Sequence, residues 1–340
     1  MLCKQKKEMK AECKVPLAGM MRGFFVMERF FLIFTVLLFV FISDAGAESG
    51  PTAADPPPTA VLLQKWTPLM ERLVNDGHDA EKIKALFTRP DVVFQPGPMA
   101  SKLQALIRKK FEPPPAVISP RLPLYESYLK PEVIAGAFSY EESNLKILET
   151  VSANYCVPKE IIVAILLIET KLGEATGVSA AFNTLASMAL VTDLDMILPY
   201  LPKDLVSEDR KDFARQRCRQ KADWAYDELK ALLAYAEKKG IDPVSIPGSI
   251  YGAIGLCQFM PTNAILYGID ADGDGFADLF TSPDALYSIA NYLKKNGWTC
   301  KMTRQHQHKV ILSYNKSMTY ANTVQAIADK LKAFKKREAP

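Results

Sequence analysis

The pattern of apolar and polar positions predicts helices along most of the chain. Residues 63–77, 80–87 and 101–111 each place apolar side chains at helical spacing, and prolines follow the third segment and end it. Residues 139–155 are expected to form one helix that begins at an N-cap, Ser139. Alternation with a period of two, which indicates strands, is scarce. The expected fold class is therefore mainly α.

The most apolar segment runs from residue 158 to residue 173 and predicts a helix that is buried on every side. Pro158 suits the first turn of this helix, and Gly173 is expected to end it. Within the segment, eight apolar residues, 161–168, are followed by a carboxylate, Glu169. Two further helices are predicted after it, over residues 182–191 and 209–240.

An apolar run near the N-terminus is typical of a secretory signal. It covers about 13 residues, 30–42, fewer than the roughly 20 that span a membrane, and residues 45–47 fit the small side chains of a cleavage site. We therefore expect residues 1–47 to be a leader, with Met27 as the true start because its n-region is then of ordinary length. An uncleaved anchor or an over-long n-region is the alternative. Residues 48–60, rich in proline and small side chains, are expected to be a linker.

Composition indicates a folded protein without a strong net charge. The chain has 340 residues, of which 49% are hydrophobic, enough for one large or two moderate domains. Without the leader, 35 lysines and arginines face 34 acidic residues, so net charge gives no reason to expect a nucleic-acid partner. The four cysteines after the leader, Cys156, Cys218, Cys257 and Cys300, allow three pairings or free buried thiols.

Helical geometry surrounds Glu169 with apolar neighbours. The positions one turn away are Ile165 and Leu166 on one side and Leu172 and Gly173 on the other. Burial without a nearby cation raises the pKa of a carboxyl group, so this side chain would be protonated near neutral pH and suited to general acid catalysis. The alternative is a structural glutamate that pairs with a lysine or arginine from elsewhere in the fold.

Residues 270–284 match the spacing of an EF-hand calcium loop. Aspartates stand at loop positions 1, 3 and 5 and a glycine at position 6, and the backbone carbonyl of position 7 would be another ligand. Position 12 is Thr281 rather than the usual glutamate, so the site is complete only if Asp284 closes it. The expected ligands are Asp270, Asp272, Asp274, Phe276 and Asp284. The alternative is a loop of Asx turns without a metal.

A glycine-rich stretch precedes this loop and ends in a polar amide. Gly248, Gly252 and Gly255 let the backbone approach another group closely, and Gln258 offers both a donor and an acceptor. The stretch has neither a GK[ST] nor a GxGxxG pattern, so it does not predict a phosphate loop. Taken alone, it indicates only a loop.

Four sequence blocks, in this order, resemble the B-type lytic murein transglycosylases of the lysozyme-like superfamily. They are VPKEIIVAILLIETKLG from residue 157, GSIYGAIGLCQFMP from residue 248, DADGDGFADLFTSPDALYSIANYLKKNGW from residue 270 and SYNKSMTYANTV from residue 313. The resemblance implies a lysozyme-like catalytic domain over residues 119–335 with a variant EF-hand calcium loop. An N-terminal helical extension over residues 61–118 would precede this domain.

The resemblance also implies a reaction and its residues. Enzymes of this family are periplasmic and cleave the β-1,4 bond between N-acetylmuramic acid and N-acetylglucosamine, which leaves a 1,6-anhydro end. The single catalytic acid falls on Glu169, and the family's longer calcium loop ends at Asp284. Calcium is therefore expected as a structural ion, and no organic cofactor is expected. The residues expected to contact the sugars are Ser249, Gln258, Tyr292, Tyr314 and Asn315.

Two departures from the family pattern fall near these residues. The stretch GSIYGAIGLCQ lacks an aromatic residue of the usual GS(W/F)AGAMGYGQ and places Cys257 beside the cleft, and Leu172 stands where tryptophan is common. The expected consequence is altered stacking of the sugars. The acid, Gln258 and the calcium aspartates are all present.

One carboxyl group is enough for such a reaction if the substrate supplies the nucleophile. Glu169 would protonate the leaving oxygen, the 2-acetamido group would stabilise C1, and Glu169 would then take the proton of the 6-hydroxyl as it closes on C1. Tyr314 and Asn315 are expected to position the acetamido group. The alternatives are a muramidase on the same scaffold that admits water, and a non-catalytic peptidoglycan-binding protein.

The expected location and partners follow from the leader and the resemblance. The protein is expected in the periplasm, and at the membrane if the leader is not cleaved. Peptidoglycan strands are the expected partner, other cell-wall enzymes are candidate partners, and the chain is expected to be a monomer.

Overall fold

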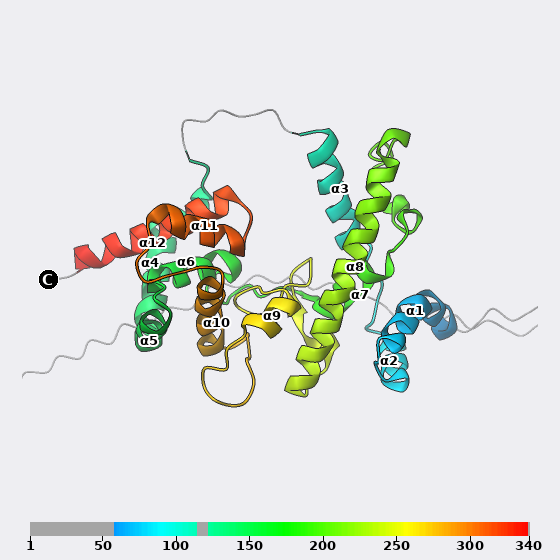
Figure 1. Ribbon diagram of the computed structural model, residues 1–340, viewed down its shortest axis with the longest axis horizontal. Coiled ribbons are helices and arrows are strands. Elements are labelled where there is room, and N and C mark those ends of the chain that lie inside the picture. The colour runs from blue at the N-terminus through cyan, green and yellow to red at the C-terminus, as the bar shows by residue number, and fades with distance from the viewer. Residues whose placement is uncertain (1–57, 114–121, 339–340) are drawn as a thin grey trace, which may run out of the picture. The chain divides into compact units, whose positions relative to one another are not determined.

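The computed structural model describes residues 58–113 and 122–338 (Figure 1). The predicted leader, residues 1–47, lies outside these ranges, as does the predicted linker as far as residue 57. The linker was expected to end at residue 60, whereas α1 already begins at Pro58. Proline is tolerated in the first turn of a helix, so the prolines at the end of the predicted linker do not prevent helix formation there.

Helices form most of the described structure, as the apolar pattern predicted. Two short strands, β1 (Ser179–Ala180) and β2 (Pro247–Gly248), pair antiparallel with Ser179 opposite Gly248. The α-helices are α1 (Pro58–Asn75), α2 (Ala80–Phe87), α3 (Gly97–Phe111), α4 (Pro131–Ser143), α5 (Leu145–Tyr155), α6 (Lys159–Thr170), α7 (Ala181–Leu190), α8 (Glu208–Lys239), α9 (Pro261–Tyr267), α10 (Ser282–Lys295), α11 (Arg304–Tyr314) and α12 (Met318–Glu338). The short 3-10 turns are η1 (Glu126–Leu129), η2 (Leu194–Met196), η3 (Leu198–Tyr200) and η4 (Pro243–Ser245).

The prediction of one helix over residues 139–155 is wrong, because the structure divides this segment between α4 and α5. Ser139 is not an N-cap. It lies inside α4, and its hydroxyl donates to the carbonyl of Ala135, 3.1 Å away. The break comes at Asn144, whose backbone N–H and side-chain amide both donate to the carbonyl of Tyr140. A side chain that bonds to nearby backbone in this way favours the end of a helix.

The central helix α6 ends at Thr170, three residues before the expected end at Gly173. Lys171 and Leu172 follow with φ of 50° and 65°, and Gly173 has φ of 104°. Left-handed backbone is unfavourable for residues that carry a Cβ, so the two non-glycine positions are strained. Backbone bonds from Lys171 to Leu167 and from Leu172 to Leu166 hold this turn closed.

The core around α6 is built from helices on both sides of it in the sequence. Residues 161–167 are at most 4% exposed, as the continuous apolar run predicted. α12 lies along α6, and α4, α5 and α10 also pack against it. Within the described ranges no single helix is long and apolar enough to cross a membrane. Only α5 and α6 together reach that length and composition, across a bend of 113°.

A second group of helices joins the N-terminal segment to the middle of the chain. α7 packs along α8, α3 packs against both, and α1 contacts α7 (Figure 1). α9 then joins α8 to α10. The predicted division between residues 61–118 and 119–335 stays a prediction, and α3 and α8 are in contact across it.

A buried ion cluster fixes the C-terminal half of α12. The ammonium group of Lys335 contacts the carboxylates of Glu141 on α4 and Glu160 on α6, the second at 3.0 Å. Glu141 is fully buried, and burial is the main cause that raises the pKa of its carboxyl group. Removing one partner of such a cluster would leave a buried charge unpaired, at about 3–5 kcal/mol. The cluster therefore helps to hold the C-terminal part of α12 against α4 and α6.

A disulfide bond between Cys156 and Cys300 selects one of the pairings that the sequence left open. It joins the residue after α5 to the segment before α11, across 144 positions of the sequence. Cys218 and Cys257 are free and buried. A stable disulfide is typical of proteins that fold in an oxidising compartment.

The disulfide predicts a thiol count and a stability difference. Protein that begins at residue 48 should show two thiols when it is unfolded without reductant and four after reduction. Reduction should lower the free energy of unfolding by about 2–5 kcal/mol, because the unfolded chain is no longer closed into a long loop. Thiol titration and urea unfolding measure the two quantities. The double variant C156S/C300S should be destabilised equally and should not respond to reductant, and four thiols before reduction would contradict the bond.

Candidate active site

Glu169 lies in the last turn of α6, partly buried, and accepts a hydrogen bond from a tyrosine that the sequence analysis did not identify. The hydroxyl of Tyr320, on α12, donates to Glu169 Oε1 at 2.7 Å. Burial raises the pKa of the Glu169 carboxyl group from its ordinary value to about 7, and the bond from Tyr320 opposes this rise. Near neutral pH the group is therefore divided between its acid and carboxylate forms.

Cations contribute nothing to this shift. In the described part of the chain Glu169 forms no ion pair, and only burial and the Tyr320 bond move its pKa. The alternative of a structural glutamate paired with a distant lysine or arginine therefore has no support in the structure. No second carboxylate is among the groups that act on its pKa either, and Glu174, five residues along the chain, is exposed.

Aromatic rings form a continuous packed array beside Glu169. Tyr320 stacks on Tyr314 with the ring planes 8° apart, and Tyr314 meets the edge of Tyr292, with the two centroids 5.0 Å apart. Phe259 contacts both Tyr292 and Tyr314. The array fixes the ring of Tyr320 and therefore the direction in which its hydroxyl donates.

The hydroxyl groups of two predicted sugar contacts are directed at backbone carbonyls. Tyr314 donates to the carbonyl of Cys257 at 2.6 Å, and Tyr292, 8% exposed, donates to that of Ser313 at 2.7 Å. Burial raises the pKa of both phenols. The hydroxyls of these tyrosines are therefore already occupied in the free protein, and their rings belong to the packed array beside Glu169.

The glycine-rich stretch, residues 248–258, contacts both the end of α6 and the loop with the calcium-binding pattern, residues 270–284, called here the calcium-type loop. At Gly255, with φ of 73°, a Cβ would lie 2.5 Å from the Cβ of Leu279, and the next residue, Leu256, donates its N–H to the carbonyl of Leu279. The carbonyl of Leu256 accepts the hydroxyl of Thr170, directly after Glu169, at 2.9 Å. The close backbone approach expected from the glycines is present here.

Three other predicted contacts lie around this stretch. Gln258 has a left-handed backbone and donates its amide to the carbonyls of Thr176 and Gly255, at 3.1 and 3.0 Å. Ser249 accepts the N–H of Ala253 with its hydroxyl oxygen, at 3.0 Å. Asn315 is exposed, at the C-terminal end of α11. The structure thus brings Gln258 to the loop that follows α6, and Tyr314 to the stacked ring of Tyr320.

A hollow of about 470 Å³ flanks the end of α6 on the side of α4. Leu167 and Leu172 line it together with Tyr128 and Val133, and the exposed Lys171 stands at its edge. The hydroxyl of Tyr128 donates to the carbonyl of Ile168, next to Glu169. Glu174 also lines this hollow, whereas Glu169 and the predicted sugar contacts are not among its lining residues.

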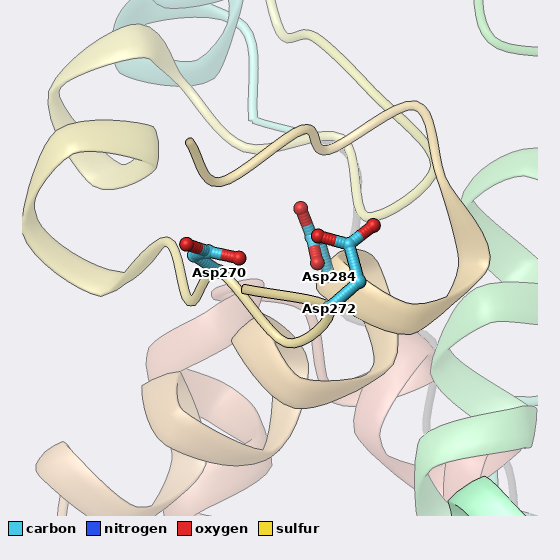
Figure 2. Close-up of side chains that lie close together, drawn as sticks. All are labelled: Asp270, Asp272 and Asp284. Atoms are coloured by element: carbon cyan, nitrogen blue, oxygen red, sulfur yellow. The ribbon is translucent and has the colours of Figure 1, made fainter. Parts of the chain in front are cut away.

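Three of the expected metal ligands converge at the start of α10. The carboxylates of Asp270, Asp272 and Asp284 each have an oxygen atom within 4.8 Å of the others (Figure 2). This group does not include Asp274, whose side chain accepts the N–H of Phe276. Asp284 is fully buried and accepts the N–H groups of Ala271 and Asp278, so it closes the loop as the sequence required.

The chemistry of this group fits a hard divalent cation. Carboxylate oxygens are the ligands that calcium prefers. Burial raises the pKa of Asp284, and the negative charges of Asp272 and Asp270 raise it further, so a cation here would offset mutual repulsion. Asp270 also accepts the N–H groups of Gly273 and Gly275. Asp272 and Asp274 each accept the N–H group two residues on, in Asx turns, so the loop holds its shape through backbone donors as well.

The family is shown by comparison with known sequences. A family profile described as the transglycosylase SLT domain matches residues 63–307, more than half of the chain. The chain belongs to this family. Membrane-bound lytic murein transglycosylase B of Escherichia coli (strain K12) is 32% identical over 144 residues, which are 42% of this chain and 33% of that protein. The match therefore covers about a third of that relative's length.

Two solved structures have a similar fold. The lytic transglycosylase Slt35 of Escherichia coli, in complex with calcium, has a TM-score of 0.58 at 19% identity and covers 79% of this chain and 93% of its own. SltB3 of Pseudomonas aeruginosa, in complex with NAG-anhNAM-pentapeptide, has a TM-score of 0.57 at 22% identity and covers 79% of each chain. The lysozyme-like fold expected from the resemblance is confirmed.

Tyr320 is the member of this SLT-domain site that sequence reasoning missed. It stands in the block SYNKSMTYANTV, six residues after Tyr314, so a signal was present in the quoted residues. Sequence spacing gave no reason to choose it, because its partner Glu169 is 151 positions away. Only the packing of α12 on α6 brings the two side chains together.

The Tyr320 bond predicts the behaviour of a phenylalanine variant. Tyr320→Phe removes a donor that stabilises the ionised carboxylate, so the pKa of Glu169 should rise by about one unit above its wild-type value. Carboxyl-carbon NMR of protein with labelled glutamate measures this pKa directly. Tyr140→Phe is a suitable control, because Tyr140 donates to Ser282 rather than to Glu169. A Glu169 pKa that falls or stays unchanged in Tyr320→Phe would show that the bond does not act on the acid.

Proposed function

We propose that the protein is a peptidoglycan lytic transglycosylase that cleaves the β-1,4 bond between N-acetylmuramic acid and N-acetylglucosamine and leaves a 1,6-anhydro end. The observation that carries the proposal is the state of Glu169: a carboxyl group with a pKa of about 7, bonded to Tyr320 and without a counter-ion. Such a group can give a proton to a glycosidic oxygen and later take one back near neutral pH.

One carboxyl group can carry both proton transfers. Ordinary glycosidases use two carboxylates, one of them to activate water or to attack the sugar. Here the 6-hydroxyl of the muramic acid is the nucleophile. The attack is therefore intramolecular and has an entropic advantage over attack by free water. Glu169 protonates the leaving oxygen first. The carboxylate so formed, with the Tyr320 hydroxyl bonded to it, accepts the proton of the 6-hydroxyl as the ring closes.

The predicted sugar contacts have distinct parts in this proposal. Tyr292 and Tyr314 would supply an apolar wall, while Ser249, Gln258 and the exposed Asn315 would supply polar atoms near the substrate, and Asn315 would bond the 2-acetamido group. The hydroxyl and carbonyl oxygens of these side chains can accept, and the amide of Asn315 can donate. The names of relatives support this substrate, since SltB3 is described in complex with NAG-anhNAM-pentapeptide and the Escherichia coli relative as a membrane-bound murein enzyme.

The site geometry also bears on the two alternatives, a muramidase and a non-catalytic peptidoglycan-binding protein. A muramidase needs a base placed to activate water. The carboxylate that lines the hollow at the end of α6 is Glu174, which is exposed and five residues from Glu169. A binding protein does not need a carboxyl group whose pKa lies near 7. An exported protein of the cell envelope fits both the substrate and the disulfide.

We also propose calcium as a structural ion, held by Asp270, Asp272 and Asp284 with Asp274 and the carbonyl of Phe276 as further ligands. The ion would neutralise the converging carboxylates and tie the loop to the first turn of α10. The same loop contacts Gly255 and Leu256 through Leu279, so its order supports the end of α6. The related Slt35 structure contains calcium, which supports this choice of metal.

Glu169→Gln should abolish turnover. The change keeps the shape of the side chain and removes both proton transfers, each of which contributes about 10²- to 10⁴-fold. Mass spectrometry of fragments released from purified cell walls measures the loss and the 1,6-anhydro product together. Glu208→Gln, at an exposed position in the first turn of α8, is the control and should stay active. A Glu169→Gln variant that releases 1,6-anhydro fragments at the wild-type rate would remove the proposal.

The raised pKa of Glu169 also predicts how the melting temperature of Glu169→Gln differs from that of the wild type at different pH values. In the wild type, the stability contributed by protonated Glu169 is complete below its unfolded-state pKa near 4.5 and is lost as pH rises through about 7. At pH 8 this loss amounts to roughly 3 kcal/mol, which glutamine does not suffer. Glu169→Gln should therefore melt higher than the wild type at pH 8 and equally at pH 4. A lower melting temperature at both pH values would instead indicate a structural ion-pair residue.

Chelation tests the calcium proposal. If calcium binds only the folded state, it stabilises by about 2.7 kcal/mol at a hundredfold excess over Kd, so EDTA should lower the melting temperature. Asp272→Asn should remove this response, because Asp272 is an exposed member of the converging group and its loss leaves the packing intact. Asp212→Asn, on the exposed face of α8, should keep it. An unchanged response in Asp272→Asn would show that the ion, if any, binds elsewhere.

A further inference from the structure

Two lysines lie on aromatic rings, and one of these rings, Tyr251, belongs to the glycine-rich stretch. The ammonium group of Lys102, on α3, is 3.7 Å from the ring centroid of Tyr251, and that of Lys221, on α8, is 5.3 Å from the ring of Trp224. α3 and α8 pack against each other (Figure 1). Both lysines are half-buried.

Neither lysine has an acidic partner among the described residues. Other half-buried lysines do: Lys230 pairs with Asp76 at 3.0 Å, and Lys239 pairs with Asp278 at 2.5 Å. Burial lowers the pKa of Lys102, and the charge of Lys221 lowers it further, so the two ammonium groups repel each other. A bound anion would relieve this repulsion, and charge-assisted bonds to carboxylates are among the strong ones in proteins.

The lysines are connected to the candidate active site through Tyr251. Its backbone N–H donates to the hydroxyl of Ser249, at 3.3 Å, and Gln258 lies in the same stretch, bonded to the loop after α6. An anion bound by Lys102 would therefore lie beside a glycan strand bound at Ser249. The sugars of peptidoglycan are uncharged once the lactyl group is joined to its peptide, so the carboxylates of this polymer belong to the peptide stem.

We propose that Lys102, assisted by Lys221, recognises a carboxylate of the peptide stem on the bound glycan strand and makes the enzyme select strands that carry charged stems. This inference rests on the proposed function and extends it to the choice of substrate. The ring of Tyr251 holds the ammonium group of Lys102 in place by a cation–π contact. Lys221 adds to the positive potential that attracts the stem.

The test measures binding in the Glu169→Gln background, where no turnover occurs. Soluble glycan strands are compared with the same strands after their carboxylates have been converted to amides by carbodiimide and ammonia. The untreated strands should bind about tenfold more tightly, which corresponds to roughly 1.4 kcal/mol. Adding Lys102→Met, which keeps an unbranched side chain on the ring of Tyr251, should bring this ratio close to one. Lys102→Arg should restore most of it.

Lys65→Met is the matched control. The ammonium group of Lys65 lies 3.6 Å from the ring centroid of Phe94, a contact of the same kind that involves α1 and not the glycine-rich stretch. The tenfold ratio should survive in this variant. Melting temperatures of all variants are measured at the same time, so that a loss of binding through unfolding is recognised.

Several outcomes would overturn the inference. A ratio that stays tenfold in Lys102→Met would show that the stem is not recognised there, and an equal loss for both kinds of strand would show that Lys102 only holds the loop. A ratio that is kept, together with lost binding to phosphatidylglycerol vesicles, would assign the lysines to a lipid surface. Failure of the Glu169→Gln protein to bind either kind of strand would count against the proposed function itself.

Discussion

The hydrogen bond from Tyr320 to Glu169 joins the two helices on which the rest of the site depends. α6 supplies an apolar environment that raises the pKa of Glu169, and α12 supplies the donor that limits this rise. The bond is possible only because α12 is held along α6, at its other end by Lys335 between Glu141 and Glu160. One helix pair thus determines both the protonation state and the direction of the acid.

A strained turn follows the partly buried Glu169. Lys171 and Leu172 take left-handed backbone conformations, which end α6 one residue after the acid and turn the chain away. The glycine-rich stretch then fits against this end, since Thr170 bonds to Leu256. Strained backbone of this kind persists only where surrounding contacts hold it in place. Here one such contact comes from the glycine-rich stretch, which is far from α6 in the sequence.

The N-terminal helices do more than cover one side of the structure. α3 packs on α8 and brings Lys102 to the ring of Tyr251, in the same stretch that holds Ser249 and Gln258. A segment outside the blocks that carry the acid and the calcium-type loop therefore reaches the candidate substrate site. If the proposed function is correct, the reaction would depend on α6 and α12, and the choice of strand on contacts from α3.

Local patterns in the sequence determined α6, α7 and α8, the position of Glu169 as a charge within an apolar run, and the spacing of Asp270, Asp272 and Asp284. These features depend on neighbours within one or two turns, so periodicity and spacing reveal them. The Cys156–Cys300 bond, the Tyr320 donor and the unpaired Lys102 were decided only by the tertiary structure. The Asn144 break is local, but continuous apolar periodicity across 139–155 concealed it. The other three join residues more than a hundred positions apart, and the energy of such contacts arises from packing that no window of sequence contains.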